Sequence, residues 1–315
     1  MNSATAAGRK ITVVVPVYHN AGSLPDLFER LLRVEAELAR RHSVTLQLVF
    51  VNDGSTDASQ EVLLGFKQVR ADCVVVRLSR NFGAMPATHA GFRFVDGDAF
   101  ICIAADLQDP PEILLDMVPR WLGGSKFVIA VRASREDPWA SRLAAGVYYR
   151  LLRLLVAPGY PSGGFDAALM DRALLAPMRD ASKNTFTSLL AYWLGYQPDV
   201  VEYHRVRREH GTSGWTFAKK LKSFFDVMLG FSALPIRMMS CVGATVALGS
   251  VAYGAWIAVG ALLGQIAVSG FATLAVMLTF LSGLILLMLG LIGEYVWRIY
   301  DEVNRRPDAV IDEVA

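Results

Sequence analysis

Two long stretches near the C-terminal end of the chain contain no Asp, Glu, Lys or Arg: residues 240–263 and 271–293. Each is longer than the ~20 apolar residues that a helix needs to cross a bilayer. The segment between them, 264–270, is also uncharged and is short enough to form only a tight turn. These stretches predict two transmembrane helices, about 240–263 and 271–293, in a hairpin within residues 237–298. Two buried helices of a soluble core are the alternative, which the scarcity of polar interruptions disfavours.

Basic residues flank this predicted hairpin on both of its outer sides, and they are Lys219, Lys220, Lys222, Arg237, Arg298, Arg305 and Arg306. Positive charge collects on the cytoplasmic side of membrane proteins. We therefore expect a multi-pass protein of the inner (cytoplasmic) membrane, with a cytoplasmic domain over residues 1–212 and a cytoplasmic C-terminal tail over residues 299–315. Tyr295, Trp297 and Tyr300 suit an aromatic belt at the membrane boundary.

Residues 213–236 precede the hairpin and mix aromatic residues with lysines. Trp215, Leu221, Phe225 and Met228 recur at helical spacing, while Lys219 and other polar residues fall elsewhere. This pattern predicts an amphipathic juxtamembrane helix that lies among lipid headgroups. A helix packed on the preceding domain is the alternative.

The first 212 residues alternate between two kinds of segment. Apolar, β-branched runs occur at 11–17, 46–53, 73–79, 99–106 and 126–132, and helical patterns occur at 25–41, 57–69, 86–95 and 110–122. Such alternation predicts an α/β domain with a mostly parallel sheet that helices cover on both faces. With 315 residues, the chain has room for this domain and the membrane hairpin.

Charge and cysteine content restrict the possible partners and metals. The net charge of +2 is too small to indicate nucleic acid as a partner. Cys73, Cys102 and Cys241 lie far apart in apolar segments, so we expect three buried thiols and neither a disulfide nor a zinc site. Free thiols also favour a reducing, cytoplasmic setting for the polar domain.

Ligands of parallel sheets bind at the carboxyl ends of the strands. The chain has no GxGxxG or GxxxxGK[ST] motif that would indicate a dinucleotide or P-loop site. Asp53 lies at the tip of the second strand, where no local feature of the sequence requires a carboxylate, whereas Asp57 is placed to cap the next helix. Arg80 and Asn81 end the third strand, where an arginine fork suits phosphate oxygens. His89 is interpreted as structural because it falls inside the following helix.

The stretch CIAADLQDPPE, residues 102–112, combines two signals. Asp109 and Glu112, with two prolines between them, have the form of a helix start with an acidic N-cap and a capping-box glutamate. That form leaves Asp106 and Gln108 unexplained. Their oxygens at a strand exit could reach a divalent cation, since Mg²⁺ keeps several waters and takes its other ligands from substrate phosphates.

Taken together, these residues resemble the family-2 glycosyltransferases of GT-A fold, and within them the polyprenyl-phosphate glycosyltransferases, such as bactoprenol glucosyltransferases and dolichyl-phosphate mannose synthases. The resemblance rests on VVVPVYHN, FVNDGSTD, LSRNFG, AADLQDPPE, AVRASRED, GGFDAALMDR, RREHGTSGW and the terminal hairpin. It implies inverting transfer of a hexose from a nucleotide-diphosphate sugar, with UDP-glucose favoured over GDP-mannose and other UDP-sugars. The acceptor would be polyprenyl (undecaprenyl) phosphate at the cytoplasmic membrane face, for envelope glycan modification, and the resemblance also implies a homo-oligomer.

The resemblance also assigns roles to individual positions. It places Pro16, Tyr18, Asp53, Arg80 and Asn81 around the nucleotide sugar. It places Asp106 and Gln108 at a divalent metal, Mg²⁺ or Mn²⁺, and Asp106 and Asp166 at the chemistry. It places Arg132, Arg135, Arg208 and Ser213 around the donor and acceptor phosphates.

One residue departs from the family pattern, because Ala104 stands where relatives carry the first aspartate of the metal motif. Other interpretations remain open at this stage. Asp166 could cap or turn before a strand-like AALM, and Arg132 and Arg135 could pair with Glu136 and Asp137 nearby. A membrane glycosyltransferase with a hydroxyl acceptor (a lipid or a polysaccharide) is a second function, and a catalytically silent membrane partner is a third.

Overall fold

The structure is a computed structural model of the full chain. It describes residues 8–133, 146, 148–154, 156–161, 163–181, 187–204, 234–263, 270–304 and 306–315. Two compact units make up the chain. One comprises Met1–Lys220 and Pro307–Ala315, and the other comprises Leu221–Arg306.

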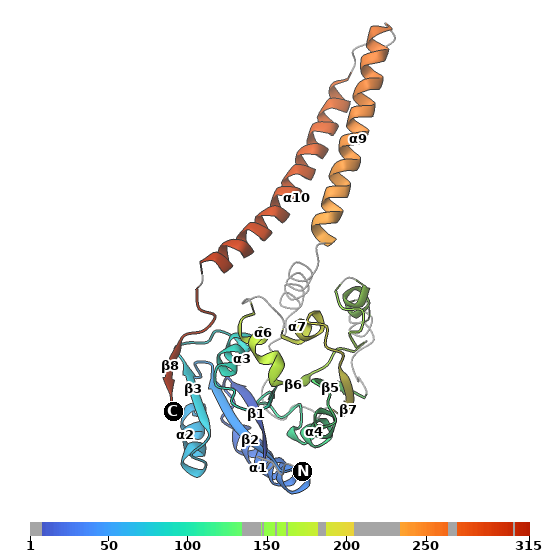
Figure 1. The fold of residues 1–315 in the computed structure, drawn as a ribbon. Helices are drawn as coiled ribbons and strands as arrows, with labels where there is room; N and C mark the ends of the chain where they lie inside the picture. Colours follow the sequence, from blue (N-terminus) through green and yellow to red (C-terminus); the bar gives the residue numbers. More distant parts are fainter. Residues whose placement is uncertain are drawn as a thin grey trace. The chain divides into compact units, whose positions relative to one another are not determined.

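The first unit is built on an eight-stranded sheet, in the order β7-β5-β6-β4-β1-β2-β3-β8 (Figure 1). Its strands are β1 (Arg9–Val17), β2 (Val44–Asn52), β3 (Val74–Leu78), β4 (Ala99–Cys102), β5 (Phe127–Arg132), β6 (Ala167–Asp171), β7 (Asp199–Tyr203) and β8 (Ile311–Val314). β6 and β8 run antiparallel to their neighbours, and the other neighbouring pairs are parallel. The predicted mostly parallel sheet is therefore confirmed.

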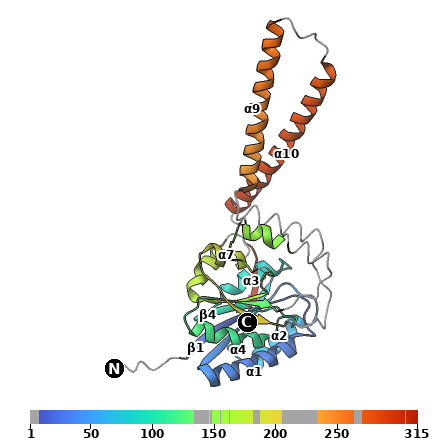
Figure 2. The same ribbon diagram turned by 90° about the vertical axis from the view of Figure 1, so that its right-hand side faces the viewer.

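Helices cover both faces of this sheet (Figure 2), and an apolar core lies between the sheet and the helices on each face. One core packs under α1 (Leu24–His42), α2 (Ser59–Val69) and α4 (Leu114–Leu122). The other packs under α3 (Ala84–Phe92), α6 (Leu175–Arg179) and α7 (Thr187–Trp193). Two-sided burial explains why the central strands read as unbroken apolar runs with no polar alternation.

Helix α1 shows how the sequence sets these elements. Its buried Leu24, Leu27, Leu31, Val34 and Leu38 recur every three to four residues and face the sheet. The helix ends where Ser43 adopts a left-handed conformation with a φ of 55°. The next strand, β2, begins at the following residue, Val44.

The C-terminal segment supplies the edge strand β8, which the sequence did not lead us to expect. β8 pairs antiparallel with β3, and the backbones of Val75 and Ala315 exchange hydrogen bonds of 3.0 and 2.8 Å. Arg77 adds an ion pair to Asp312 at 2.7 Å. β8, which follows the last long helix of the chain, thus belongs to the same sheet as the strands that precede the first long membrane-type helix.

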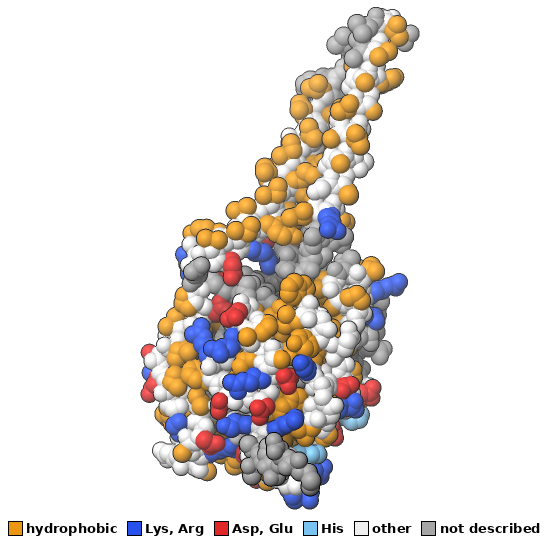
Figure 3. Space-filling view, viewed as in Figure 1, with side chains coloured by type: hydrophobic (Ala, Val, Ile, Leu, Met, Phe, Trp, Pro, Cys, Tyr) orange, Lys and Arg blue, Asp and Glu red, His pale blue; other side chains and the backbone are white. Residues whose placement is uncertain are grey.

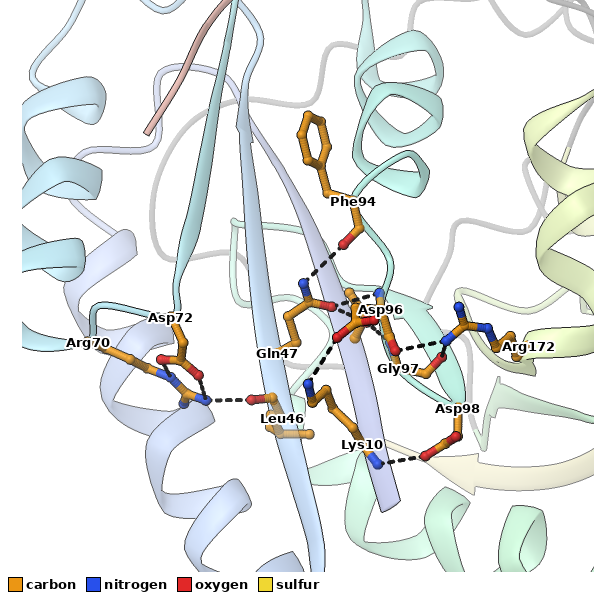
Figure 4. Close-up of polar contacts among 11 residues, drawn as sticks. Lys10, Leu46, Gln47, Arg70, Asp72, Phe94, Asp96, Gly97, Asp98 and Arg172 are labelled. Atoms are coloured by element: carbon orange, nitrogen blue, oxygen red, sulfur yellow. Dashed lines mark hydrogen bonds and ion pairs between the residues drawn. The ribbon is translucent and has the colours of Figure 1, made fainter. Parts of the chain in front are cut away.

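Polar contacts tie the amino-terminal edge of the sheet together (Figure 4). The Lys10 ammonium pairs with Asp96 at 3.0 Å, and its backbone N–H donates to Asp98 at 3.0 Å. The Gln47 side-chain amide donates to the Phe94 carbonyl oxygen at 3.0 Å. These groups satisfy one another at the end of the sheet opposite the strand tips, so they serve the fold.

The second unit contains two long helices, α9 (Leu234–Leu262) and α10 (Phe271–Val303). Each includes a window long and apolar enough to cross a membrane, Ile236–Ile257 and Phe280–Val303. The side chains of these windows are not buried within the chain, and Figure 3 shows the helices carrying apolar side chains with few charges. The two predicted helices are therefore present, and α10 continues past the predicted residue 293.

The cysteines differ from one another more than expected. All three are free thiols, but only Cys73 is buried, while Cys102 is half-buried and Cys241 is exposed on α9. The prediction of buried thiols is thus right for Cys73 and wrong for Cys241, which lies on an exposed part of the α9 surface. Burial raises the pKa of the Cys73 thiol to about 11.

Candidate functional site

The loops that follow β1 and β2 are joined by hydrogen bonds at the carboxyl edge of the sheet. The His19 N–H donates to the Ser55 hydroxyl at 3.1 Å, and the Thr56 N–H donates to His19 Nε2 at 3.2 Å. Asp57 accepts the N–H of Ser59, in the first turn of α2, at 3.1 Å, although the N-cap position itself is Ala58. These bonds hold the loop after β1 against the loop after β2.

Asp53 connects the second strand tip to the third. It is buried, with 2% of its surface exposed, and its carboxylate accepts the N–H groups of Phe82 at 2.7 Å and Gly83 at 2.9 Å. Burial raises the pKa of Asp53, and these two hydrogen bonds and the nearby Arg80 oppose that rise. The carboxylate therefore has a local structural use that the sequence did not reveal. A contact between Asp53 and a nucleotide stays a prediction.

Gly54 allows the close approach of these two loops. Its φ is +65°, and a Cβ at this position would lie 2.5 Å from the carbonyl carbon of Arg80. A side chain would push the Arg80–Asn81 segment away, so glycine is needed for both its conformation and its size.

The other residues assigned to the nucleotide lie on this same edge. Pro16 is in β1, paired with Val51, and Tyr18 follows the strand with 46% of its surface exposed. Arg80 and Asn81 are exposed, and the Arg80 guanidinium lies over the Phe82 ring at 4.1 Å. The structure therefore gathers Pro16, Tyr18, Asp53, Arg80 and Asn81 at the carboxyl ends of β1, β2 and β3.

Asp106, Leu107 and Gln108 form a tight turn after β4. The Gln108 N–H donates to the Asp106 carboxylate at 3.2 Å, and Leu107 adopts a φ of 60°, which costs a non-glycine residue about 1–2 kcal/mol. The Leu107 side chain packs against the core under α1, α2 and α4 and so offsets that cost. The hydroxyl of Ser23, just before α1, donates to the Ala105 carbonyl at 2.7 Å and fixes the turn further.

The predicted capping roles of Asp109 and Glu112 are wrong. A 3₁₀ turn, η1 (Pro111–Ile113), begins after Pro110 without a side-chain cap. Pro110 and Pro111 have no N–H to donate, which leaves Asp109 little to cap. Asp109 instead accepts a hydrogen bond from the Tyr203 hydroxyl at 2.6 Å, and Glu112 forms a two-point ion pair with Arg30.

Arg132 and Asp166 form a two-point ion pair at the ends of neighbouring strands. Arg132 is the last residue of β5, and Asp166 directly precedes β6, which runs antiparallel to β5. Arg132 Nε donates to Asp166 Oδ2 at 2.6 Å, and Arg132 Nη2 donates to Asp166 Oδ1. Burial acts to lower the pKa of Arg132, but the ion pair with Asp166 outweighs it, and the net pKa is raised.

Asp166 thus serves an arginine in this structure. The alternative that Asp166 merely caps or turns does not hold, because its carboxylate bonds residues from other strands, and its role in catalysis stays a prediction. Arg132 pairs with Asp166, 34 residues away, and its expected local partners Glu136 and Asp137 lie outside the described residues.

Tyr203 is a member of this site that the sequence did not identify. It ends β7, beside Arg132 in the parallel register of β5 and β7, and 6% of its surface is exposed. Its hydroxyl lies 2.6 Å from Asp109 Oδ1 and 2.8 Å from Asp166 Oδ2. Burial and these two carboxylates raise the pKa of Tyr203, so the phenol keeps its proton. Tyr203 thereby links the loop after β4 to the ion pair at β5 and β6.

Arg135, Arg208, Ser213 and most of segment 213–236 lie outside the described residues. His89 belongs to α3 and is buried, with its ring nitrogens 3.2 Å from the Thr187 hydroxyl and 3.5 Å from the Asp308 carboxylate. These contacts are those of a packing residue, as the sequence indicated.

The donors that could hold a divalent cation are few. Among the described residues, no group of three or more His, Cys, Asp or Glu side chains is placed to bind a metal. Asp106 and Gln108 offer one carboxylate and one amide oxygen from a single fixed turn, and Ala104 offers none. This set fits an oxygen-loving cation that takes its remaining ligands from water and from substrate phosphates.

The chain is similar in sequence to known proteins. Residues 12–177 match the model of the family described as Glycosyl transferase family 2. A bactoprenol glucosyl transferase of Shigella phage SfII is 35% identical over 306 residues, covering 96% of this chain and 97% of the phage protein. A prophage bactoprenol glucosyl transferase homolog of Escherichia coli (strain K12) is 33% identical and covers 97% and 99%.

A solved mannosyl-3-phosphoglycerate synthase from Rubrobacter xylanophilus is similar at 15% identity with a TM-score of 0.48, over 75% of this chain and 76% of the synthase. The expected GT-A fold and transferase class are confirmed by the family match and by the sheet with its flanking helices. Both the family model and the near full-length relatives lead to one conclusion: this chain is a glycosyltransferase and belongs to glycosyl transferase family 2.

Proposed function

We propose that this glycosyltransferase moves a hexose from a nucleotide-diphosphate sugar, UDP-glucose first among them, to a polyprenyl phosphate such as undecaprenyl phosphate. Inversion at the anomeric carbon and a site at the cytoplasmic face of the inner membrane complete the proposal. The observation that carries it is the Arg132–Asp166 pair beside the Asp106–Gln108 turn, in a chain that also has two apolar helices. Relatives named bactoprenol glucosyl transferases support the lipid acceptor and the glucose.

On the donor side, the strand tips of β1, β2 and β3 would hold the nucleotide. Pro16, Tyr18 and Asp53 lie there, and the exposed Arg80 and Asn81 segment is fixed by Asp53 and Gly54. Asp106 and Gln108 would hold a divalent cation, which when bound supplies positive charge to the leaving diphosphate.

On the acceptor side, Arg132 would meet the lipid phosphate. Asp166 takes the Nε and Nη2 edge of the guanidinium and thereby fixes the plane of the fork. A guanidinium held in this way donates to a phosphate oxygen without first losing side-chain freedom. Arg135, Arg208 and Ser213 remain proposed partners of the same phosphates.

The acceptor needs no strong general base. A phosphate monoester has a second pKa of about 6 and is mostly a dianion at neutral pH. Asp166 is already committed to Arg132 and Tyr203, which suits a carboxylate that orients the acceptor site. The chief tasks of the chain are then to bring two anions together and to align the acceptor oxygen with the anomeric carbon.

The strand β8 supports a hairpin with both ends in one compartment. It follows α10 yet pairs with β3, which precedes α9. Segments that share one sheet must lie on the same side of a membrane, so a crossing by α9 requires a return by α10. A cysteine-free chain with Gly270→Cys should react with an impermeant maleimide from outside intact cells, and Arg9→Cys should not. The reverse labelling would contradict the orientation.

A hydroxyl acceptor is the second candidate. It would require a true base to remove the hydroxyl proton, and Asp166 would have to leave its ion pair to serve as one. The proposal that a phosphate is the acceptor needs no such change.

The proposal is tested by incubating the detergent-solubilised chain with a panel of radiolabelled nucleotide sugars and undecaprenyl phosphate. Mg²⁺, Mn²⁺ or EDTA would be present, and Asp106→Asn would be compared with Asp116→Asn, whose side chain is exposed on α4. We expect one donor to label the lipid. EDTA and Asp106→Asn should each abolish labelling, whereas Asp116→Asn should not. Labelling that survives both would contradict the cation at this turn, and no labelling by any donor would contradict the acceptor.

A further inference from the structure

Four strand-end segments meet at the Tyr203 hydroxyl. Asp109 comes from the loop after β4, Arg132 ends β5, Asp166 precedes β6, and Tyr203 itself ends β7. The two carboxylates that this hydroxyl contacts lie 57 residues apart in sequence, at positions 109 and 166.

We propose that Tyr203 is a positioning residue of the transferase, which couples the Asp106–Gln108 turn to the Arg132–Asp166 pair through its hydroxyl. The inference rests on the proposed function for its effect on transfer, but the coupling itself is a property of the chain. Asp109 is one residue beyond Gln108, so a hydrogen bond to Asp109 fixes the end of the turn. The same hydroxyl contacts Asp166 Oδ2, the oxygen that also accepts from Arg132 Nε.

The geometry makes this role specific to the hydroxyl. A phenol has one hydrogen, and here two carboxylate oxygens lie within hydrogen-bond distance of its oxygen, at 2.6 and 2.8 Å. The hydroxyl can donate that hydrogen to either carboxylate. Movement of the Asp109 loop therefore changes whether Asp166 accepts a hydrogen bond from Tyr203. The backbone of Tyr203 adds to this control, since its carbonyl accepts the N–H of Ala133, next to Arg132, at 2.9 Å.

The test removes the hydroxyl and leaves the ring. Tyr203→Phe should lower kcat/KM for undecaprenyl phosphate about 10- to 100-fold, the effect of losing a hydrogen bond to a charged group. The KM for the nucleotide sugar should rise as well, because Asp109 directly follows the Asp106–Gln108 turn that is proposed to hold the cation of the leaving diphosphate. Asp109→Asn should give a similar loss, and the double variant should be no worse than either single one.

Tyr192→Phe is the matched control. The Tyr192 hydroxyl is also buried in this domain, and it has no hydrogen-bond partner among the described residues. Its removal should leave transfer unchanged. Effects of Tyr203→Phe that equal those of Tyr192→Phe, or effects of Tyr203→Phe and Asp109→Asn that multiply, would overturn the proposal.

Hydrogen exchange provides a readout that does not depend on transfer. Tyr203→Phe should speed amide exchange in residues 103–110 and 163–167, and Tyr192→Phe should not. If the parent protein labels no polyprenyl phosphate, the proposed function fails, and exchange alone decides the coupling. Unchanged exchange in residues 103–110 would then refute it.

Discussion

Asp53→Asn separates two roles that a buried carboxylate at a strand tip can have. In the structure, its two oxygens accept the N–H groups of Phe82 and Gly83 at 2.7 and 2.9 Å. Asparagine keeps one acceptor and turns an NH₂ group toward the other N–H. The loss of one hydrogen bond to a charged group costs about 1.5–3 kcal/mol. Removing a charge that burial disfavours returns part of this, so we expect a net loss of about 1–2 kcal/mol in the free energy of unfolding.

The measurement is urea unfolding of the full chain in detergent, together with nucleotide affinity by calorimetry. Asp57→Asn is the control, since Asp57 is an exposed carboxylate on the same loop, and its loss should cost less than about 1 kcal/mol. If Asp53→Asn keeps the stability of the parent but loses nucleotide binding, the structural role is refuted and a direct contact with the nucleotide explains the residue.

The pH dependence of the same variant gives an independent check. The folded-state pKa of Asp53 is raised above the ordinary value of an aspartate, chiefly by burial. The folded state therefore binds this proton more tightly than the unfolded state, and its contribution to stability falls as pH rises through the folded pKa. The stability of the parent minus that of Asp53→Asn should decrease over that interval. An increase would contradict the raised pKa.

Three further predictions concern the fold that supports the site. Gly54→Ala should lower the free energy of unfolding by about 2–4 kcal/mol, because Gly54 has a positive φ and a Cβ would clash with the neighbouring loop. Gly65→Ala, which has open space around it in α2, should instead raise the free energy of unfolding by about 0.5–1 kcal/mol. Urea unfolding of the two variants measures both effects. Deleting residues 307–315 should expose the β3 edge and promote aggregation on heating, while Arg77→Gln should cost less than about 1 kcal/mol, as light scattering and thermal unfolding will show. Cys73, buried and with a pKa of about 11, should react with maleimide at pH 8 only in urea, and rapid labelling of the folded chain would contradict its burial.

The sequence predicted those parts of the fold that local patterns determine. Unbroken apolar runs indicated β1 to β5, and spacing such as that of Leu24, Leu27 and Leu31 indicated the covering helices. The edge strand β8 was missed because its residues are mostly exposed and carry charge, and only the partner strand β3 makes them a strand. Tertiary pairing of this kind leaves little local signal.

The sequence singled out polar residues at strand tips where it offered no local use for them. Asp106 and Gln108 were singled out in this way, and their role at a divalent cation stays a prediction. Asp109 was misread because its capping pattern is local, whereas its partner Tyr203 lies 94 residues away. Tyr203 itself ends a short run, Asp199–Tyr203, in which an aromatic residue looks like any core residue. Its place in the site becomes apparent only from the register of β5 and β7, which puts Tyr203 beside Arg132.

The identity of the acceptor group tests the central proposal most directly. The detergent-solubilised chain would be given UDP-[¹⁴C]glucose with undecaprenyl phosphate or with undecaprenol, and the anomeric configuration of the product would be read by NMR. Arg132→Lys, which cannot form the two-point pair with Asp166, would be measured in parallel. We predict transfer to the phosphate alone, with inversion, and a large loss in Arg132→Lys. Equal transfer to the alcohol, with Arg132→Lys as active as the parent, would contradict the account.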